Sequence, residues 1–421
     1  MKLNRTNHPV PLAPERIVHI GIGAFAKAHQ LWYTQKVDVD NEWGVVAFTG
    51  RTPKIAEELI EQDGLYTLVE RSAAGDEFEI IDRVVRAVDG NNATDFTKTM
   101  AKPEIAVVTI TITEAGYGIS DDLPTPAISR LAFALEMRRR ISGAPIALVS
   151  CDNIPNNGEV LKNAISDVFS TYDSDARIWL EKNVSFVSTS IDRITPKTTP
   201  EDYSEVSGQT GWDDNSVTVT EPFKDWVLCG EFPAGRPAWE NAGAKFVTDI
   251  DAFEKRKLWL LNGAHSLLAY AGILRGHKTV AEAIGDSSCR GWVDEFWSDA
   301  VKHLPAKELD LDKYRKALIE RFENPRIAHQ LQQIAIDGAT KLAVRIAPLA
   351  KAELASGAKV EALILGSWIA FLRAGAYQDS QADAIRLNLN SVAGLIGLLD
   401  TELAQNHEFV NQVTKAVLFF S

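Results

Sequence analysis

The chain has 421 residues, of which 45% are hydrophobic and 24% are charged, a composition typical of a soluble globular protein. This length exceeds what one ordinary core accommodates, so we expect two domains. The formal net charge is -13, from 44 basic and 57 acidic residues. That balance argues against nucleic acid as a partner, because affinity for phosphate backbones depends on clustered Lys and Arg.

Three cysteines, at positions 151, 229 and 289, are too few and too widely spaced to predict a disulfide framework or a zinc site. We therefore expect no metal. The first nine residues contain no apolar stretch, so no signal peptide is expected. The longest apolar runs are interrupted by polar residues such as Asn262 and His265, which argues against a membrane span. Together these features predict a cytoplasmic protein without a membrane partner.

The first recognisable pattern is a buried strand over residues 16–21 that runs into Gly21-Ile-Gly23-Ala-Phe25-Ala26 and then a helix. Strand, glycine turn and helix are typical of the first unit of a dinucleotide-binding domain. Gly21 would permit the tight turn, Gly23 would let the backbone approach a pyrophosphate, and the small Ala26 would allow close packing. The alternative is a tight turn in any α/β protein, but its position after the first strand favours a nucleotide site.

The second predicted strand, over residues 43–49, bears on the choice of cofactor. A site that prefers NAD usually ends this strand in Asp or Glu, which binds the ribose hydroxyls. Here the strand runs into Thr49, Gly50 and Arg51, with no acid. Arg51 could accept the 2′-phosphate of NADP, or it could be a solvated loop charge. The choice between NAD(H) and NADP(H) therefore stays open.

Polar residues follow several later strands. Residues 66–70 and 77–82 predict a hairpin, and buried parallel strands are expected over 105–113, 145–150 and 184–188. Glu114 follows the first of these three, Asn153 the second and Asp192 the third. The carboxyl ends of parallel strands are where α/β sheets bind ligands. The alternatives are a helix-capping glutamate at Glu114 and an Asx-turn at Asn153.

Residues 198–216 are polar and predict a loop, and regular strands stop near residue 250. The fold class is therefore α/β followed by all-α, with a nucleotide-binding domain over residues 1–250 and a mostly helical domain over residues 251–421. Helices are expected over 251–274, 278–284, 290–302, 310–321, 325–336, 348–355, 358–375, 379–387, 389–397 and 407–419. Lys341 and Arg345 lie four residues apart on one helical face; the alternative is an exposed basic stripe.

The helix that opens the second domain carries Lys257, Asn262 and His265 within an apolar segment. On an α-helix these side chains fall within an arc of roughly 140°. Burial beside apolar residues disfavours a charged lysine and lowers its pKa, as a general base requires. The alternative is a core helix whose Lys257 reaches solvent and whose His265 is a buried core histidine.

These motifs together resemble the polyol-specific long-chain dehydrogenases, the mannitol dehydrogenase family. The element Lys257-x4-Asn262-x2-His265 matches the family's catalytic signature. Its companions span most of the chain: residues 21–30, 111–117, 150–153 with 157–158, 192–196 and 235–240, and Asp337-Gly338 with Lys341. The resemblance implies an expanded Rossmann domain followed by a helical domain, with the substrate between them. It also implies metal-independent hydride transfer with NAD(H) or NADP(H), and it favours a monomer.

The resemblance also implies roles for matching residues. Lys257 would be the general acid/base, Asn153 and Asn262 the amide donors to the reacting oxygen, His265 a substrate-positioning partner, and Glu114 the carboxylate that controls proton exchange with water. Asp192 and Lys341 would line the substrate pocket, with Gln333 and Arg345 beside them. The predicted cofactor-binding set is Gly21, Gly23, Phe25, Ala26, Arg51 and Thr113.

One departure from the family pattern concerns the substrate. Mannitol dehydrogenases carry an arginine eight residues before the lysine that matches Lys341, and here that position is Gln333. This version is more similar to the fructuronate reductases, and Arg345 or Lys341 could pair with a hexuronate carboxylate. The leading expectation is therefore D-fructuronate and D-mannonate. Fructose and mannitol are the runner-up, followed by arabinitol or tagaturonate; a nucleotide-binding sensor without turnover is the alternative from another class.

Overall fold

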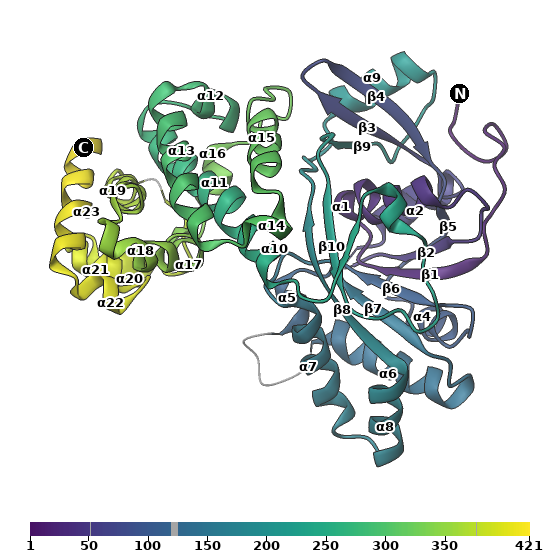
Figure 1. The fold of residues 1–421 in the computed structure, drawn as a ribbon. Helices are drawn as coiled ribbons and strands as arrows, with labels where there is room; N and C mark the ends of the chain where they lie inside the picture. Colours follow the sequence, from purple (N-terminus) through teal and green to yellow (C-terminus); the bar gives the residue numbers. More distant parts are fainter. Residues whose placement is uncertain (51, 119–124, 376) are drawn as a thin grey trace. The chain divides into compact units, whose positions relative to one another are not determined.

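Two units make up the computed structural model, which describes residues 1–50, 52–118, 125–375 and 377–421. Unit 1 is Met1–Asp251 and unit 2 is Ala252–Ser421. Unit 1 contains the strands, and unit 2 is mostly helical (Figure 1). The predicted fold class, a Rossmann-like sheet domain followed by a mostly helical domain, is confirmed.

Unit 1 is built on an eight-stranded sheet in the order β11-β10-β8-β7-β6-β1-β2-β5. Its strands are β1 (Glu15–Ile20), β2 (Gly44–Phe48), β5 (Val84–Val88), β6 (Val107–Ile110), β7 (Ile146–Ser150), β8 (Val184–Asp192), β10 (Asp225–Cys229) and β11 (Lys245–Val247). Neighbouring strands are parallel except β8 and β10. Every residue of β2, β6 and β7 is buried, as expected for parallel strands covered on both faces.

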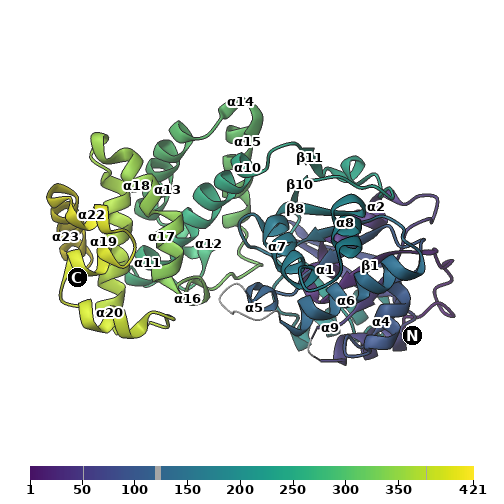
Figure 2. The same cartoon turned by 90° about the horizontal axis from the view of Figure 1, so that it is seen from below.

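Helices cover both faces of this sheet. The core on one face includes residues of α1 (Ala24–Ala28), α2 (Gln30–Val37) and α3 (Lys54–Glu61). The core on the other face includes residues of α4 (Ala93–Met100), α6 (Pro126–Ile141), α7 (Asn157–Phe169) and α8 (Ser174–Asn183). In Figure 2 the second group, α4 with α6, α7 and α8, is seen on the near side of the sheet. The β-rich runs and the helices between them thus form a doubly wound layer structure.

The predicted hairpin forms, as β3 (Tyr66–Ser72) and β4 (Gly75–Ile81), but it belongs to a separate three-stranded sheet with β9 (Thr218–Thr220). The prediction of a loop over residues 198–216 is wrong, because α9 (Pro200–Thr210) lies within it. Thr199 and Asp202 form a capping box at its start and Pro200 occupies the first turn. Both features favour helix initiation in a segment with little apolar periodicity.

Two strands differ in length from their predictions. The strand expected over 105–113 ends at Ile110, because the backbone amides of Ile112 and Thr113 donate to the Asp152 carboxylate. The strand expected over 184–188 continues to Asp192, because it pairs with β10 along its whole second half. Asp192 is therefore the last residue of a strand rather than part of the loop after it.

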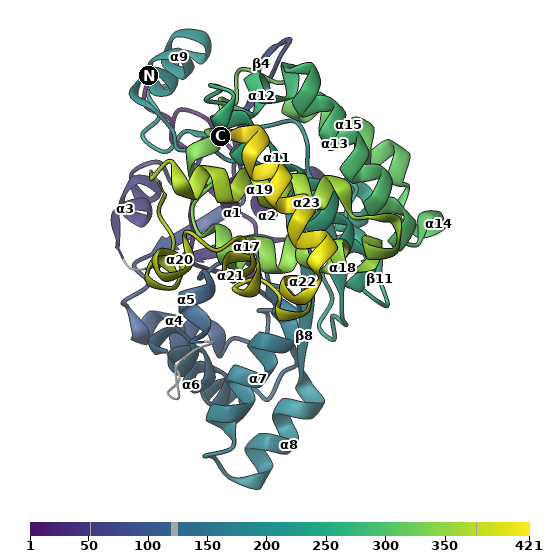
Figure 3. The same cartoon turned by 90° about the vertical axis from the view of Figure 1, so that its left-hand side faces the viewer.

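Unit 2 packs its helices around two buried segments, α11 and α19 (Figure 3). Its elements are α10 (Asp251–Arg256), the π-helix η2 (Lys257–Gly263), α11 (Ala264–Leu274), α12 (Val280–Gly285), α13 (Ser287–Ala300), η3 (Val301–His303), α14 (Ala306–Leu309), α15 (Leu311–Phe322), α16 (Leu331–Ile334), α17 (Gly338–Arg345), α18 (Ala347–Glu353), η4 (Leu354–Ser356), α19 (Lys359–Arg373), α20 (Ala382–Asn388), α21 (Val392–Gly397), α22 (Thr401–Gln405) and α23 (His407–Phe420). Within the described parts of the chain, no helix has the length and apolar character needed to cross a membrane.

The helix predicted over residues 325–336 is mostly absent, and only α16 remains of it. Residues 325–327 form a turn and a bend, and Gln330, directly before α16, pairs with Thr279 at the start of α12. Val280 donates its amide to the His329 carbonyl at 3.0 Å, and Leu331 donates to the Lys278 carbonyl at 2.9 Å. Tertiary pairing therefore overrides the helical pattern of this stretch.

Candidate active site

The glycine turn after β1 has the geometry that the sequence predicts. Gly21 has a φ of +91°, and a Cβ at this position would lie 2.0 Å from the Thr111 carbonyl oxygen, so only glycine fits. The amides of Gly21 and Ile22 both donate to the Phe48 carbonyl, at 2.9 and 3.0 Å. Gly23 caps α1 in an extended conformation, Phe25 is partly buried and Ala26 is fully buried.

This turn places the start of α1 at the carboxyl end of β1, where the free backbone N–H groups of a helix can donate hydrogen bonds to an anion. The geometry fits a pyrophosphate, and the cofactor-binding roles of these residues stay a prediction. Arg51, the residue on which the NADP(H) alternative depends, lies outside the described residues.

Asp152 joins the carboxyl ends of two central strands. Its Oδ1 accepts the Thr113 amide at 2.8 Å, and its Oδ2 accepts the Ile112 amide at 2.9 Å and the Tyr117 hydroxyl at 2.7 Å. Tyr117 also lies 2.6 Å from Ser150 Oγ. The end of β6 is therefore tied to the end of β7. Glu114, the first residue of α5 (Glu114–Tyr117), directly follows this linkage.

Asn157 extends the linkage to β8. Its Nδ2 donates to the carbonyl oxygens of Asp152 and Thr189, at 2.9 and 2.8 Å, and its Oδ1 accepts the Thr189 amide at 2.8 Å. Three strand ends are thus connected by buried side chains. The predicted site residue Asn153 is exposed on this edge, and Asp192 is buried at the end of β8.

Tyr117, Asp152 and Asn157 lie within the motifs that match the family, but the sequence predicted no role for them. The sequence did contain a sign of their importance, because each is a polar residue shortly after the end of a strand. The sequence could not show that Tyr117 and Asn157 both form hydrogen bonds to Asp152.

The segment Lys257–Gly263 is a π-helix rather than the α-helix that the sequence predicted. Backbone hydrogen bonds in a π-helix run between residues five apart. Residues five apart therefore come closer to alignment along the helix than they do in an α-helix, where they are separated by roughly 140°. Lys257 and Asn262 have that spacing, so the wider turn brings their positions toward one face.

Side chains from neighbouring helices satisfy carbonyl groups of the π-helix. Trp297 donates its indole N–H to the Leu260 carbonyl at 2.7 Å. The Asn262 carbonyl accepts from Ser266 Oγ at 3.1 Å and from Arg345 Nη1 at 3.3 Å. Gly263 packs so closely on α13 that a Cβ there would lie 2.5 Å from the Phe296 ring. These contacts explain why the irregular turn is stable in a buried helix.

His265 is buried and its Nε2 has no hydrogen-bond partner within the described chain. Its ring lies between Phe322 and His329, with ring centroids 5.0 and 5.1 Å away. Burial, reinforced by His329, Arg321 and Arg345, lowers the pKa of His265 well below 6.5. The lowered pKa favours the neutral imidazole.

Lys341 and Arg345 form a cation pair beside the π-helix, and the exposed basic stripe considered from the sequence is wrong. Burial lowers the pKa of Arg345 to about 10 and, together with the charge of Arg345, lowers the pKa of Lys341. Arg345 contacts Ser266 Oγ at 3.2 Å, and Lys341 donates to the Ile334 carbonyl at 3.2 Å. No carboxylate among the described residues forms an ion pair with either.

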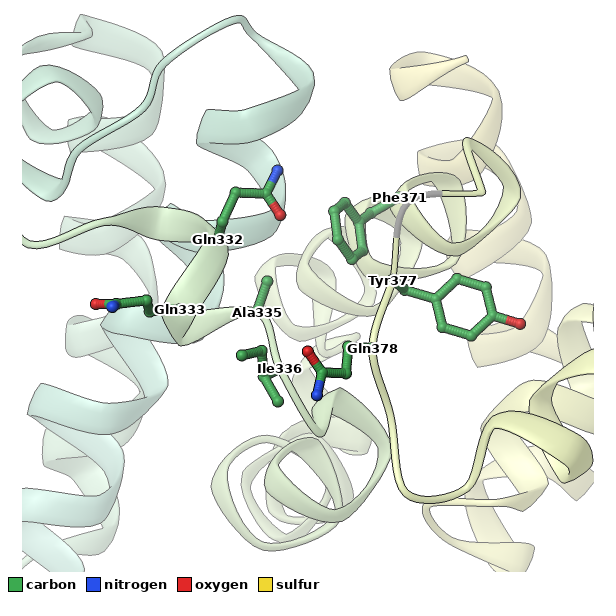
Figure 4. A pocket seen from close by; sticks show the side chains of 7 residues that line it. All are labelled: Gln332, Gln333, Ala335, Ile336, Phe371, Tyr377 and Gln378. Carbon is green, nitrogen blue, oxygen red and sulfur yellow. The ribbon is translucent and has the colours of Figure 1, made fainter.

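Gln333 lies at a cavity of about 340 Å³ in unit 2. Figure 4 shows Gln332, Phe371 and Gln378 grouped around it, whereas the Gln333 side chain extends away from Phe371. The lining residues are Gln332, Gln333, Ala335, Ile336, Phe371, Tyr377 and Gln378. These described side chains are all uncharged. The structure therefore does not place Lys341 and Arg345 in the cavity beside Gln333, although the sequence suggested grouping the three.

No metal cluster appears in the parts of the chain that the structure describes: no three His, Cys, Asp or Glu side chains gather in a way that could hold an ion.

Family models match both units. Residues 15–241 match the mannitol dehydrogenase Rossmann domain, and residues 249–419 match the mannitol dehydrogenase C-terminal domain. The chain belongs to the mannitol dehydrogenase family. The resemblance inferred from the motifs is confirmed, as is the prediction of an oxidoreductase at the level of this family.

Members of the mannitol dehydrogenase family similar to this chain differ in substrate and cofactor. D-mannonate oxidoreductase of Escherichia coli (strain K12) is 34% identical, with 95% of this chain and 92% of that protein covered. Polyol:NADP oxidoreductase of Gluconobacter oxydans (strain 621H) is 33% identical, with 78% and 73% covered. The structure of Pseudomonas fluorescens mannitol 2-dehydrogenase with NAD and D-mannitol is 28% identical, with a TM-score of 0.82 and 99% and 96% covered.

The buried His265 predicts a specific pH dependence of stability. Its folded-state pKa lies below the unfolded value of 6.5, so the unfolded chain binds more protons once the pH falls below that value. The stability that neutral His265 contributes is present above pH 6.5 and is lost as the pH falls. Urea unfolding between pH 8 and pH 5 should show a shallower loss for His265→Gln than for the wild type.

His19, whose pKa burial lowers to about 4, contributes a slope of the same sign and is present in both proteins. The comparison therefore isolates His265. Identical pH slopes for the two proteins would contradict this account of its burial.

Proposed function

We propose that this member of the mannitol dehydrogenase family is a nicotinamide-dependent oxidoreductase that interconverts a keto sugar acid and its alcohol, with D-fructuronate and D-mannonate as the leading pair. The observation that carries the acidic substrate is the Lys341–Arg345 pair, which lies beside the π-helix. Asp337 and Asp379 act electrostatically on Lys341, but no carboxylate among the described residues forms an ion pair with either cation. A substrate carboxylate would supply the missing countercharge. The similarity to a protein named D-mannonate oxidoreductase supports the same choice.

The proposed chemistry assigns each polar group a task. Lys257 exchanges a proton with the reacting hydroxyl or carbonyl oxygen, as a general acid/base. Asn262 and Asn153 donate amide hydrogens to that oxygen, which stabilises the negative charge that develops on it during reduction. Neutral His265 offers its unpartnered Nε2 to a substrate hydroxyl, and Glu114 controls proton exchange between Lys257 and water.

The cofactor carries the hydride, and the chain supplies orientation and charge. The glycine turn supports its binding, because the strict steric limit at Gly21 and the extended Gly23 leave backbone open to a pyrophosphate. We propose NAD(H). NADP(H) is the alternative, because Thr49 rather than an acid directly follows β2. Related proteins include both an NAD complex and a polyol:NADP oxidoreductase.

A neutral substrate, fructose and mannitol, is the second candidate. The cavity of about 340 Å³ beside Gln333 favours it, because amide and phenol side chains suit a hydroxylated chain without charge. A nucleotide-binding sensor without turnover is less well supported. Such a protein would not need Lys257, Asn262 and Asn153, and all three are present.

The substrate class can be tested by a panel of keto sugars and keto uronates with NADH and NADPH, followed at the nicotinamide absorbance band. We expect D-fructuronate to be reduced with a higher kcat/KM than fructose. Reduction of fructose without reduction of fructuronate would show that the leading choice is wrong and the runner-up is right. Absence of turnover with every polyol, keto sugar and uronate would favour the sensor.

Lys257→Ala should lower kcat by about 100- to 10,000-fold, the usual contribution of a general acid/base, while the affinity for NADH is retained. The measurement is steady-state turnover together with fluorescence titration of NADH. Lys255→Ala is the matched control, since Lys255 is an exposed lysine on the preceding turn. Equal activity of the two variants would remove Lys257 from the mechanism.

Lys341→Gln and Arg345→Gln should each raise KM for the acidic substrate by about 10- to 100-fold, the effect of a lost hydrogen bond to a charged group. KM for fructose should change less than about threefold. The ratio of the two effects is decisive, because Arg345→Gln also removes a contact to the Asn262 carbonyl, and that loss acts on both substrates. Arg386→Gln, at an exposed arginine of unit 2, serves as control; equal losses with both substrates would argue against carboxylate pairing.

A further inference from the structure

We propose that Asp152 is a positioning residue that sets the geometry of the catalytic groups at two strand ends, Glu114 and Asn153. This inference rests on the proposed function, since it assumes that these two residues take part in the reaction. Asp152 is buried, with 8% of its surface exposed, and it immediately precedes Asn153. Its carboxylate reaches across to the segment that immediately precedes Glu114.

The two carboxylate oxygens match the arrangement of their donors. Oδ1 accepts the Thr113 amide and Oδ2 accepts the Ile112 amide, at 2.8 and 2.9 Å. Two consecutive backbone N–H groups therefore point at one side chain. Only a group with two acceptor oxygens satisfies both, and an asparagine amide would present N–H groups to one of them. The chain here leaves the sheet early, because these amides no longer pair with a neighbouring strand.

The backbone at Thr113 shows that this contact constrains the chain. Thr113 has a φ of +64° and a ψ of +166°, a region that is almost restricted to glycine. A β-branched residue persists there only when its surroundings hold it. The strained residue lies directly before Glu114, so relaxation of Thr113 would redirect the start of α5.

The linkage also fixes the Asn153 side of the site. Tyr117, in α5, donates to Asp152 at 2.7 Å, so the helix that begins at Glu114 is held at its end as well as its start. Asn157 accepts and donates bonds that hold the Asp152 carbonyl against β8. Asp152 therefore connects the backbone on both sides of the predicted catalytic pair without itself being assigned contact with the substrate.

The test compares Asp152→Asn with a matched variant, Asp214→Asn. Asp214 is also buried and accepts two backbone amides, from Thr67 at 2.6 Å and Ser216 at 2.7 Å, and a side-chain amide, from Gln62 at 2.9 Å. Thr67 lies in β3 of the three-stranded sheet, and Gln62 and Ser216 lie in the segments that lead into that sheet. The two substitutions therefore remove comparable interactions, and both should lower the melting temperature.

We expect Asp152→Asn to lower kcat by about 100-fold, the effect of misplacing reacting groups by about 1 Å, with KM changed less than about threefold. Asp214→Asn should keep kcat within about threefold. Hydrogen exchange of the Ile112 and Thr113 amides should accelerate in Asp152→Asn only. An unchanged kcat in Asp152→Asn, or equal kcat losses in both variants, would overturn the proposal.

Two further measurements keep the test decisive. If Asp152→Asn does not fold, Tyr117→Phe removes the hydroxyl contacts to Asp152 and Ser150 and keeps both amide contacts of Asp152. A loss of about threefold to tenfold in kcat supports the proposal, and no loss overturns it. If the wild type turns over no sugar, the proposed function fails on its own. The positioning role is then judged by hydrogen exchange, and unchanged exchange at Ile112 and Thr113 in Asp152→Asn overturns it.

Discussion

The wider hydrogen-bond spacing of Lys257–Gly263 is the constraint on which the proposed chemistry of unit 2 depends. An amine and an amide five residues apart are poorly aligned on an α-helix, but a π-turn brings them toward one face. Such a turn leaves carbonyl groups that must find partners elsewhere. Trp297, Ser266 and Arg345 supply them, so the packing of α13 and α17 helps to stabilise the π-helix.

Arg345 and Arg71 differ in how their charges are compensated. Arg71, in β3, forms ion pairs with Asp76, Asp202 and Glu205. Acidic residues outnumber basic ones in this chain, which has a net charge of -13. Arg345 instead bonds a carbonyl and a hydroxyl, and its charge lowers the pKa of Lys341 nearby. Asp337 and Asp379 partly offset the positive charge at Lys341, but keeping two adjacent cations partly buried without a carboxylate in ion-pair contact is costly. A bound anion would relieve that cost, which is the physical basis for an acidic substrate.

Sequence reasoning predicted the parts of this structure that depend on local pattern. The glycine turn, the buried parallel strands and the helical second half follow from spacing and apolar periodicity. It was wrong where tertiary contacts decide: β6 ends early because Asp152 captures two amides, and the residues directly before α16 pair beside α12 instead of forming a helix. It missed α9, whose signal is a capping box rather than an apolar stripe. The π-helix could not be predicted, because two of the side chains that bond its carbonyl groups, Trp297 and Arg345, come from distant segments.

Tertiary contacts also join two motifs that are far apart in the chain, residues 111–117 and residues 150–153. Thr113 and Tyr117 flank Glu114, while Asp152 precedes Asn153, and hydrogen bonds between these neighbours join the two motifs. A catalytic side chain on a loop is only as well placed as the backbone beneath it. The strain at Thr113 shows that the loop does not adopt its conformation by intrinsic preference. Under the proposed mechanism, Asp152, Tyr117 and Asn157, to which the sequence assigned no role, are the residues that hold the backbone beside Glu114 and Asn153 in place.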